Sequence, residues 1–186
     1  MVQHEHDLPV QPPWSIEHEG TVTKPSLNYV MQRLTRNLER DRLVQDTLIA
    51  VRQQLAVDRL VLYYFFEQWQ GQVTSEALAT PSLSILGSTG GDNCFNKEYA
   101  ELYLAGRTRA IADIPQSNLD PCHKEFLASL YVKANLAVPI LTHQQLWGLL
   151  IAHHCQCARP WLEADVTLLQ NTAQKLATAP AIQDQI

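Results

Sequence analysis

Two pairs of apolar, strand-like segments constrain the fold more than any other feature of this sequence. The first pair occupies residues 58–79, is rich in β-branched and aromatic side chains, and is divided near Gln70 and Gly71. The second pair, VKANLAVPILTH and QLWGLLIAHHC in residues 132–155, is almost continuously apolar. Paired runs of this composition with polar residues between them predict β-hairpins. We therefore expect two antiparallel hairpins whose strands are largely buried.

Segments with helical spacing of apolar residues flank and separate the hairpins. The spacing in residues 26–55 predicts one long amphipathic helix or a broken pair of helices. Further helices are expected in residues 95–106, which Gly106 is placed to end, and in residues 120–130 and 161–178, with a strand in residues 107–114. Hairpins alternating with helices in this order predict an α+β domain, with a central antiparallel sheet flanked by helices.

Composition excludes two classes of partner. The chain has 14 Lys and Arg against 19 Asp and Glu, a formal net charge of −5, and its basic residues are dispersed. A phosphate backbone needs a clustered basic surface, so nucleic acid is not an expected partner. The longest apolar runs, residues 60–66 and 146–152, are too short to span a bilayer. We expect a soluble, cytoplasmic protein.

The chain divides into a leader, one globular domain and a short tail. Residues 1–25 contain four prolines among histidines and acidic residues and have no sustained apolar period, so a flexible leader is expected there. Residues 26–180 form the expected domain, and residues 181–186 the expected C-terminal tail. No sequence for a kinase, cyclase or methyl-accepting domain is present, which indicates a sensor-sized module.

Cys122 lies where a helix start can activate a thiol. Asp120 is a plausible N-cap and Pro121 suits the first helical position. Unpaired N–H groups and the helix dipole at that point stabilise a thiolate, so Cys122 is a candidate nucleophile. The alternative is a buried cysteine that packs as a small apolar residue, and composition does not decide between the two.

His123 follows Cys122 directly, but the two do not form a catalytic pair. Adjacent helical residues point about 100° apart, so the imidazole cannot easily act as a base for that thiol. A histidine that contacts a ligand attached to Cys122 is one interpretation, and a partly exposed histidine at a helix start is the other.

The sequence HHCQC in residues 153–157 raises the question of a metal site. If the strand continued through it, Cys155 and Cys157 would share a face with His153, while His154 would point away. Paired zinc-binding cysteines usually have two residues between them, so a strand end with two incidental thiols is expected, and no metal.

Several stretches together resemble a known family. The run DNCF in residues 92–95, the sequence CFNKEYAELYLAGRTRAIADI that begins at Cys94, the PCH that contains Cys122, and the segments LYVKANLAVPIL and LWGLLIAHH occur in the order found in cyanobacteriochromes. These are bilin-binding GAF domains related to phytochromes, and DNCF resembles the motif of their Asp-Xaa-Cys-Phe, dual-cysteine subfamily. The resemblance covers roughly residues 27–178 and implies a GAF fold with an antiparallel sheet of five or six strands.

The resemblance also implies a cofactor and the residues that bind it. Cys122 would form a thioether with the A ring of phycocyanobilin, which many members isomerise to phycoviolobilin. Cys94 would add reversibly to the carbon bridge between the two central pyrroles, giving a blue-absorbing state. Light would then convert the domain to a green- or teal-absorbing state by Z/E isomerisation. Asp92 would accept hydrogen bonds from pyrrole N–H groups, although an acid here can equally be a helix cap or an ordinary loop residue.

Other residues are candidate pocket contacts. Arg107 and Arg109, two apart on the expected strand, would point to one face and bind propionates, or else form a solvated strand edge. His153 resembles the family's histidine near the D ring. Candidate pocket walls, which are alternatively core residues, are Phe95, Trp69 and Tyr99.

Three functions therefore remain in view. The first is a photoreceptor module that is not an enzyme, controls an effector domain in a longer chain, and can form a homodimer through its terminal helices. The second is a GAF domain that binds a nucleotide-type regulator and stays colourless when bilin is supplied. The third is a thiol redox enzyme, which requires a disulfide or sulfenic acid cycle between Cys94 and Cys122.

Overall fold

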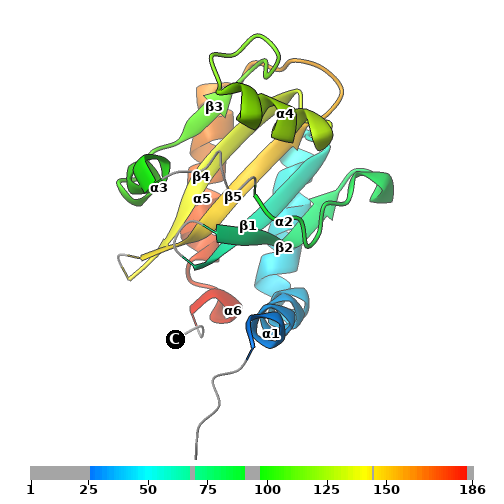
Figure 1. Cartoon of the computed structure of the whole chain (residues 1–186). Coiled ribbons are helices and arrows are strands. Elements are labelled where there is room, and N and C mark those ends of the chain that lie inside the picture. The colour runs from blue at the N-terminus through cyan, green and yellow to red at the C-terminus, as the bar shows by residue number, and fades with distance from the viewer. Residues whose placement is uncertain (1–25, 68–69, 91–96, 144, 184–186) are drawn as a thin grey trace, which may run out of the picture.

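A central antiparallel sheet organises the molecule. The computed structural model describes residues 26–67, 70–90, 97–143 and 145–183, with the backbone alone for residues 97–100. The sheet has five strands in the order β2-β1-β5-β4-β3 (Figure 1). They are β1 (Arg59–Glu67), β2 (Gln70–Leu78), β3 (Arg109–Ile111), β4 (Ala134–Thr142) and β5 (Gln145–His154). Helices flank this sheet, so the predicted α+β architecture is confirmed.

Both predicted hairpins form, and they meet in the middle of the sheet. β1 pairs with β2, β4 pairs with β5, and an antiparallel β1–β5 ladder joins the two hairpins. Glu67 pairs with Gln70, so the first hairpin is divided next to Gln70, as predicted, and Gly71 already pairs in the ladder as part of β2. Gly148 of β5 lies against β1 so closely that a Cβ there would be 2.1 Å from the Tyr63 carbonyl oxygen.

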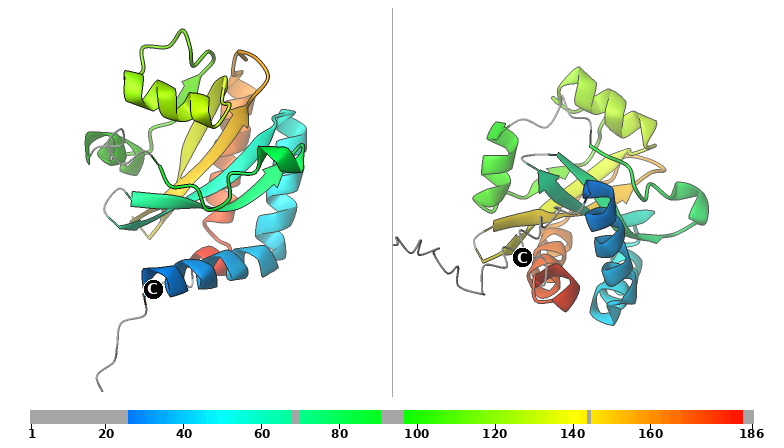
Figure 2. Two further views of the ribbon diagram at one scale, coloured as in Figure 1. Left: turned by 45° about the vertical axis from the view of Figure 1, so that its right-hand side comes forward. Right: turned by 60° about the horizontal axis from the view of Figure 1, so that its bottom comes forward.

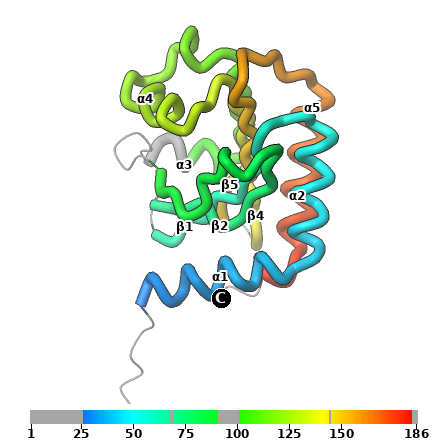
Figure 3. The backbone as a smooth tube through the Cα atoms, turned by 90° about the vertical axis from the view of Figure 1, so that its right-hand side faces the viewer, coloured from blue at the N-terminus to red at the C-terminus, as the bar shows by residue number. Residues whose placement is uncertain are grey.

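The N-terminal helical segment is a broken pair. α1 (Leu27–Arg40) and α2 (Arg42–Leu55) are separated by Asp41, whose backbone is extended. One carboxylate oxygen of Asp41 accepts a hydrogen bond from the Val44 N–H at 3.3 Å, which caps α2, and the other accepts from the Ala181 N–H at 3.2 Å. The chain therefore turns at Asp41, and α1 runs across the foot of α2 (Figure 3).

One face of the sheet is covered by α2 and α5 (Glu163–Leu176), as Figures 2 and 3 show. Strand residues alternate between faces, so even-numbered residues of β1, β4 and β5 point to these helices. They form the main core with apolar residues of the helices: Leu60, Leu62, Leu136, Val138, Ile140, Leu150, Ala152, Leu48, Leu55, Leu169 and Leu176. The short α6 (Pro180–Gln183) adds the buried side chains of Ala181 and Ile182, within the expected C-terminal tail.

The opposite face carries α3 (Lys97–Leu104), a 3-10 turn η1 (Pro81–Leu83) and α4 (Pro121–Ser129). Odd-numbered residues in the middle of β1, β4 and β5, such as Tyr63, Ala137 and Leu149, point to this side. α4 packs over one end of the sheet on a small core of its own, formed by Ile114, Leu119, Leu127 and Val132. This second core holds α4 beside the sheet and leaves space between them.

The expectation that Arg107 and Arg109 share a strand face is wrong. β3 begins at Arg109, so Arg107 lies outside the strand in the segment that follows α3. β5 ends at His154, opposite Ala134 at the start of β4, so Cys155 and Cys157 lie beyond a strand end, as expected.

Candidate ligand-binding pocket

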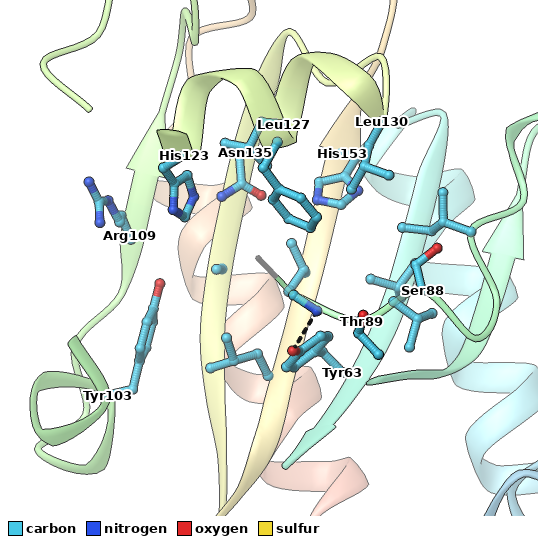
Figure 4. Close-up of a pocket in the computed structure, with 18 residues that line it drawn as sticks. Tyr63, Ser88, Thr89, Tyr103, Arg109, His123, Leu127, Leu130, Asn135 and His153 are labelled. Carbon is cyan, nitrogen blue, oxygen red and sulfur yellow. Dashed lines mark hydrogen bonds between the residues drawn. The ribbon is translucent and has the colours of Figure 1, made fainter. Parts of the chain in front are cut away.

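A cavity lies between α4 and the odd-numbered face of the sheet (Figure 4). The volume open to the centre of a water-sized sphere is about 100 Å³, and the total empty space, open solvent at the mouth included, is about 870 Å³. Small-molecule sites usually occupy about 300–1,000 Å³ and combine apolar walls with a few placed polar groups. The walls here are mostly apolar, formed by Val61, Val73, Ala137, Leu149 and Ile151 of the sheet and by Phe126, Leu127 and Leu130 of α4 and its end.

The first turn of α4 carries the Cys–His pair, and its histidine reaches this cavity. The Asp120 carboxylate caps the helix by accepting a hydrogen bond from the Cys122 N–H at 2.9 Å, and Pro121 occupies the first helical position, as predicted. Cys122 is exposed, whereas His123 is half-buried and lines the cavity. The two side chains thus point in different directions, as expected for neighbours on a helix. The Cys122 sulfur is disulfide-bonded in the structure.

His153 lies on the sheet side of the cavity and is held by a buried arginine. The Arg59 Nε–H donates to His153 Nδ1 at 3.1 Å, while its two terminal nitrogens donate to the carbonyls of Leu83, at 2.6 Å, and Leu130, at 3.0 Å. Both side chains are almost fully buried. Burial, and then the charge of Arg59, lower the pKa of His153 to about 3, so the imidazole is neutral at physiological pH.

Asn135 lies directly opposite His153 in the β4–β5 ladder, and both side chains line the cavity. Asn135 is 7% exposed, and its Oδ1 atom is buried with no hydrogen-bond partner among the described residues. Buried amide oxygens are nearly always paired in folded proteins. An unpaired one in a cavity wall therefore indicates a place where a ligand can donate a hydrogen bond.

Three more side chains border the cavity. The Tyr63 hydroxyl accepts a hydrogen bond from the Gly90 N–H at 2.9 Å, which ties β1 to the loop after η1. Tyr103 of α3 is buried against Ala137 and Leu149, and Arg109 of β3 lies nearby at the cavity edge (Figure 4). Aromatic walls with an arginine at the rim suit a flat, conjugated ligand that carries carboxylates.

Among the described residues, the structure brings three of the predicted site residues together around this cavity. Arg109, His123 and His153 line it, and Cys122 lies beside His123. Arg107 does not line it. Predicted residues that lie outside the described part of the chain are Trp69, Asp92, Cys94 and Phe95, and the Tyr99 side chain also falls outside it.

Sequence reasoning missed Arg59, Asn135, Tyr63 and Tyr103. Arg59 directly precedes the apolar run of residues 60–66, and a charge beside so apolar a run is a usable signal, because buried charges need specific partners. Asn135 carried a similar signal, a single carboxamide inside an apolar strand opposite the noted His153.

The thiols that follow β5 do not form a metal site within the described residues. The Asp58 carboxylate accepts hydrogen bonds from the Cys155 N–H at 2.7 Å and the Gln156 side chain at 2.8 Å. Burial alone would raise the pKa of Asp58, but these bonds together with His154 and Arg59 hold it below its usual value. Cys157 Sγ lies 3.7 Å from His154 Nε2. Asp58 thus holds the segment that follows β5 in place through hydrogen bonds.

No helix in the described ranges combines the length and the apolar character needed to cross a bilayer.

Comparisons with known proteins agree with this geometry. A sequence model of the GAF domain matches residues 39–179. An uncharacterised protein of Picosynechococcus sp. strain PCC 7002 is 50% identical over 152 residues, covering 82% of this chain and 93% of that protein. A putative methyl-accepting chemotaxis protein of Synechocystis sp. strain PCC 6803 is 41% identical over 118 residues, which is 63% of this chain and 12% of that protein.

Solved structures with a similar fold include photoreceptors. The cyanobacteriochrome receptor PixJ superposes with a TM-score of 0.70 at 29% identity, covering 83% of this chain and 98% of that one. A phycocyanobilin-bound GAF domain from a cyanobacterial phytochrome superposes with a TM-score of 0.66 at 27% identity, covering 83% of this chain and 93% of that one.

Proposed function

This chain belongs to the GAF domain family, and from that premise we propose that it is a photosensory module whose cavity binds a linear tetrapyrrole covalently. Its solved neighbours include GAF domains described as cyanobacteriochromes and as phycocyanobilin-bound. When bound, the bilin supplies light absorption and a double bond that light can isomerise. The alternatives are a GAF domain for a colourless regulator and a thiol redox enzyme.

The observation that carries the proposal is the placement of Cys122 and His123. The capped first turn of α4 carries the exposed Cys122 next to His123, and His123 lines the cavity. Backbone N–H groups at a helix start favour the thiolate, the reactive form. Addition of the Cys122 thiol across the ethylidene group of the A ring joins sulfur to the side-chain carbon and the thiol proton to the ring carbon.

The remaining cavity residues suit the other parts of a bilin. Apolar residues of the sheet and α4 enclose the pyrrole rings and exclude water. Arg109 at the rim supplies a guanidinium for a propionate, which a planar fork of donors binds well. His123 and His153 border the cavity from opposite sides, α4 and β5.

The second half of the proposal concerns colour. We assign Cys94 to reversible bonding at the central bridge of the bilin and Asp92 to the pyrrole N–H groups, and both residues lie outside the described part of the chain. Reversible bonding by Cys94 divides the conjugated system and gives the blue-absorbing state. The proposed bilin is phycocyanobilin, isomerised wholly or partly to phycoviolobilin, and the proposed output is control of an effector domain.

The test is the colour and covalent state of the protein made with and without bilin. The protein is expressed under reducing conditions in cells that make phycocyanobilin and in cells that do not. We expect a coloured, photoconvertible protein in the first case, with a zinc-fluorescent band that survives a denaturing gel. Cys122→Ala should lose that band, whereas Cys157→Ala, an exposed and free thiol elsewhere, should keep it.

Two outcomes would reject the proposal. A colourless protein in bilin-producing cells favours the regulator alternative. Turnover of a dithiol substrate that is lost in Cys122→Ala would favour the redox alternative.

A further inference from the structure

A second cluster of reactive side chains lies outside the cavity, where the chain leaves β5. Cys157 is exposed and free, and its Sγ atom lies 3.7 Å from Nε2 of His154. The other ring nitrogen, Nδ1, lies 3.2 Å from Oδ2 of Asp58. The imidazole therefore lies between a thiol and a carboxylate. This is the arrangement in which thiol enzymes place a nucleophile, its base and the group that orients the base.

Asp58 is the fixed end of this cluster. Its side chain is buried and accepts hydrogen bonds from the Cys155 N–H at 2.7 Å and from the Gln156 side chain at 2.8 Å. Burial alone would raise the pKa of Asp58, but these bonds and the charge of His154 keep it below its usual value. The carboxylate is therefore ionised at neutral pH, and it cannot turn away from the imidazole without breaking the two bonds.

This carboxylate determines which nitrogen of His154 carries the proton. Nδ1 is buried, makes no hydrogen bond within the described residues, and faces Asp58 Oδ2 at 3.2 Å. A protonated Nδ1 places an N–H beside the negative charge, whereas an unprotonated Nδ1 would place a lone pair there, so the protonated form is favoured. In the neutral imidazole, Nε2 is then the unprotonated nitrogen, and it is the atom that faces the Cys157 sulfur. His154 can therefore accept the thiol proton.

The two thiols of this segment differ in their surroundings. Cys155 is half-buried, and burial raises the pKa of its thiol. Cys157 is exposed and has the imidazole beside it. A thiol reacts as the thiolate, and only where a reagent can reach it. We therefore expect Cys157 to be reactive and Cys155, two residues away, to be inert.

We propose that Cys157 is a site of oxidation by hydrogen peroxide, with His154 as its base and Asp58 as a positioning residue that acts through His154. The Cys157 thiol proton passes to His154 Nε2, and a sulfur electron pair attacks one peroxide oxygen. The O–O bond breaks, and the leaving hydroxide takes the proton from Nε2 to form water. The sulfur is oxidised by two electrons to a sulfenic acid, and the peroxide is reduced.

The open position of the cluster indicates a small reagent. Asp58, His154 and Cys157 do not line the cavity below α4, and the sulfur is on the surface. A larger substrate needs a concave site that binds and orients it. Hydrogen peroxide needs only a thiolate and a proton for the leaving oxygen, which Cys157 and His154 supply. The reaction goes beyond the proposed light-sensing function, because it requires no bilin and neither of the thiols assigned to the bilin.

The test is site-resolved oxidation of the reduced, bilin-free protein at neutral pH. Hydrogen peroxide is added together with dimedone, which traps sulfenic acids, and tandem mass spectrometry measures the label on each cysteine. We expect Cys157 to be labelled about tenfold faster than Cys155 or more. His154→Gln keeps a polar side chain but supplies no base, so it should slow the labelling of Cys157 about tenfold or more. A Cys157 rate no greater than that of Cys155, or an unchanged rate in His154→Gln, would overturn the proposal.

The direction of the Asp58 effect separates this mechanism from simple charge repulsion. Asp58→Asn keeps an oxygen for the Cys155 N–H but removes the negative charge. A carboxylate that only repelled the thiolate would hinder its formation, so its removal would speed the labelling of Cys157. A carboxylate that holds the proton of His154 assists the base, so we expect slower labelling in Asp58→Asn. Faster labelling would overturn the proposal.

A matched control is Asp165→Asn. Asp165 forms an ion pair with Arg159, two residues after Cys157, and this substitution also removes one carboxylate from the neighbourhood. It should not slow the labelling of Cys157, and slowing equal to that in Asp58→Asn would overturn the role given to Asp58. Melting temperatures show whether both variants are folded.

The tautomer of His154 is measured in the wild-type protein, so this test does not depend on the folding of any variant. In ¹⁵N NMR spectra of the histidine rings, we expect the His154 Nδ1 shift of a protonated nitrogen. An unprotonated Nδ1 would overturn the proposal, because Nε2 would then carry the proton and could not accept one from the thiol. A protein that stays colourless with bilin but is oxidised at Cys157 would reject the proposed function and support this inference.

Discussion

Acidification should destabilise this protein through one histidine. Burial and the charge of Arg59 lower the pKa of His153 to about 3 in the folded protein, whereas the imidazole of an unfolded chain has a pKa of about 6.5. Above about pH 6.5 the side chain is neutral in both states and contributes no difference. At a pH between these two pKa values, only the unfolded chain binds the proton. The free energy of unfolding therefore falls as the pH falls through this window.

The size of the effect follows from the shift. Each pH unit below the unfolded pKa lowers the free energy of unfolding by about 1.4 kcal/mol. The protein is therefore expected to be about 2.7 kcal/mol less stable at about pH 4.5 than at about pH 7.5. Asp58, with its lowered pKa, adds a loss that begins at more acidic pH, because a carboxylate titrates below the imidazole. The histidine is therefore the first of these two groups to weaken the fold.

The assay is urea unfolding of the bilin-free, reduced protein at both pH values. His153→Gln keeps an acceptor for the Arg59 Nε–H and does not titrate, so it should lose about 2.7 kcal/mol less than the wild type over this pH range. His143→Asn removes an exposed turn histidine with a φ of 41°, which asparagine tolerates, and should behave as the wild type does. Equal losses in wild type and His153→Gln would refute the reasoning.

Three further perturbations have definite expected outcomes. Gly148→Ala places a Cβ 2.1 Å from the Tyr63 carbonyl oxygen and should push β1 from β5, lowering the free energy of unfolding by about 3 kcal/mol or more in urea titrations. Arg159→Lys removes the stacking of the guanidinium on the Trp161 ring, 4.7 Å away, and weakens the 3.3 Å ion pair with Asp165. We expect the free energy of unfolding to fall by about 1 kcal/mol in the same titrations. An unchanged value would show that the positive charge alone is sufficient. Asp120→Ala removes the cap of α4 and should slow bilin attachment at Cys122, measured by the appearance of the zinc-fluorescent band, while Asp120→Asn should restore the rate, because asparagine also caps.

Local patterns made the fold predictable. Alternating and near-continuous apolar runs predicted both hairpins, and the Asp-Pro pair predicted the start of α4 at the correct residue. These features depend on a few neighbouring residues, so the sequence contains them directly. The error at Arg107 arose because only three residues of β3 pair with β4, and the local sequence does not show where the pairing of so short an edge strand begins.

The cavity was less predictable because it depends on register. Asn135 belongs to the site only because it faces His153 across the β4–β5 ladder, and Arg59 only because β1 pairs with β5 so that residue 59 aligns with residue 153. A shift of one residue in either ladder would turn these side chains to the helix-covered face. Sequence reasoning identified the histidine but had no means to choose its neighbours.

The carboxylate of Asp41 joins three helices at one point. One oxygen caps α2 just after the chain leaves α1, and the other holds the first turn of α6 through the Ala181 N–H. The first and last helices of the described chain are thereby anchored to the same side chain, with no strand between them. A tilt of α1 must move this anchor, and α6 must follow or lose its bond. The domain therefore has a short mechanical linkage between its two ends that bypasses the sheet and the cavity.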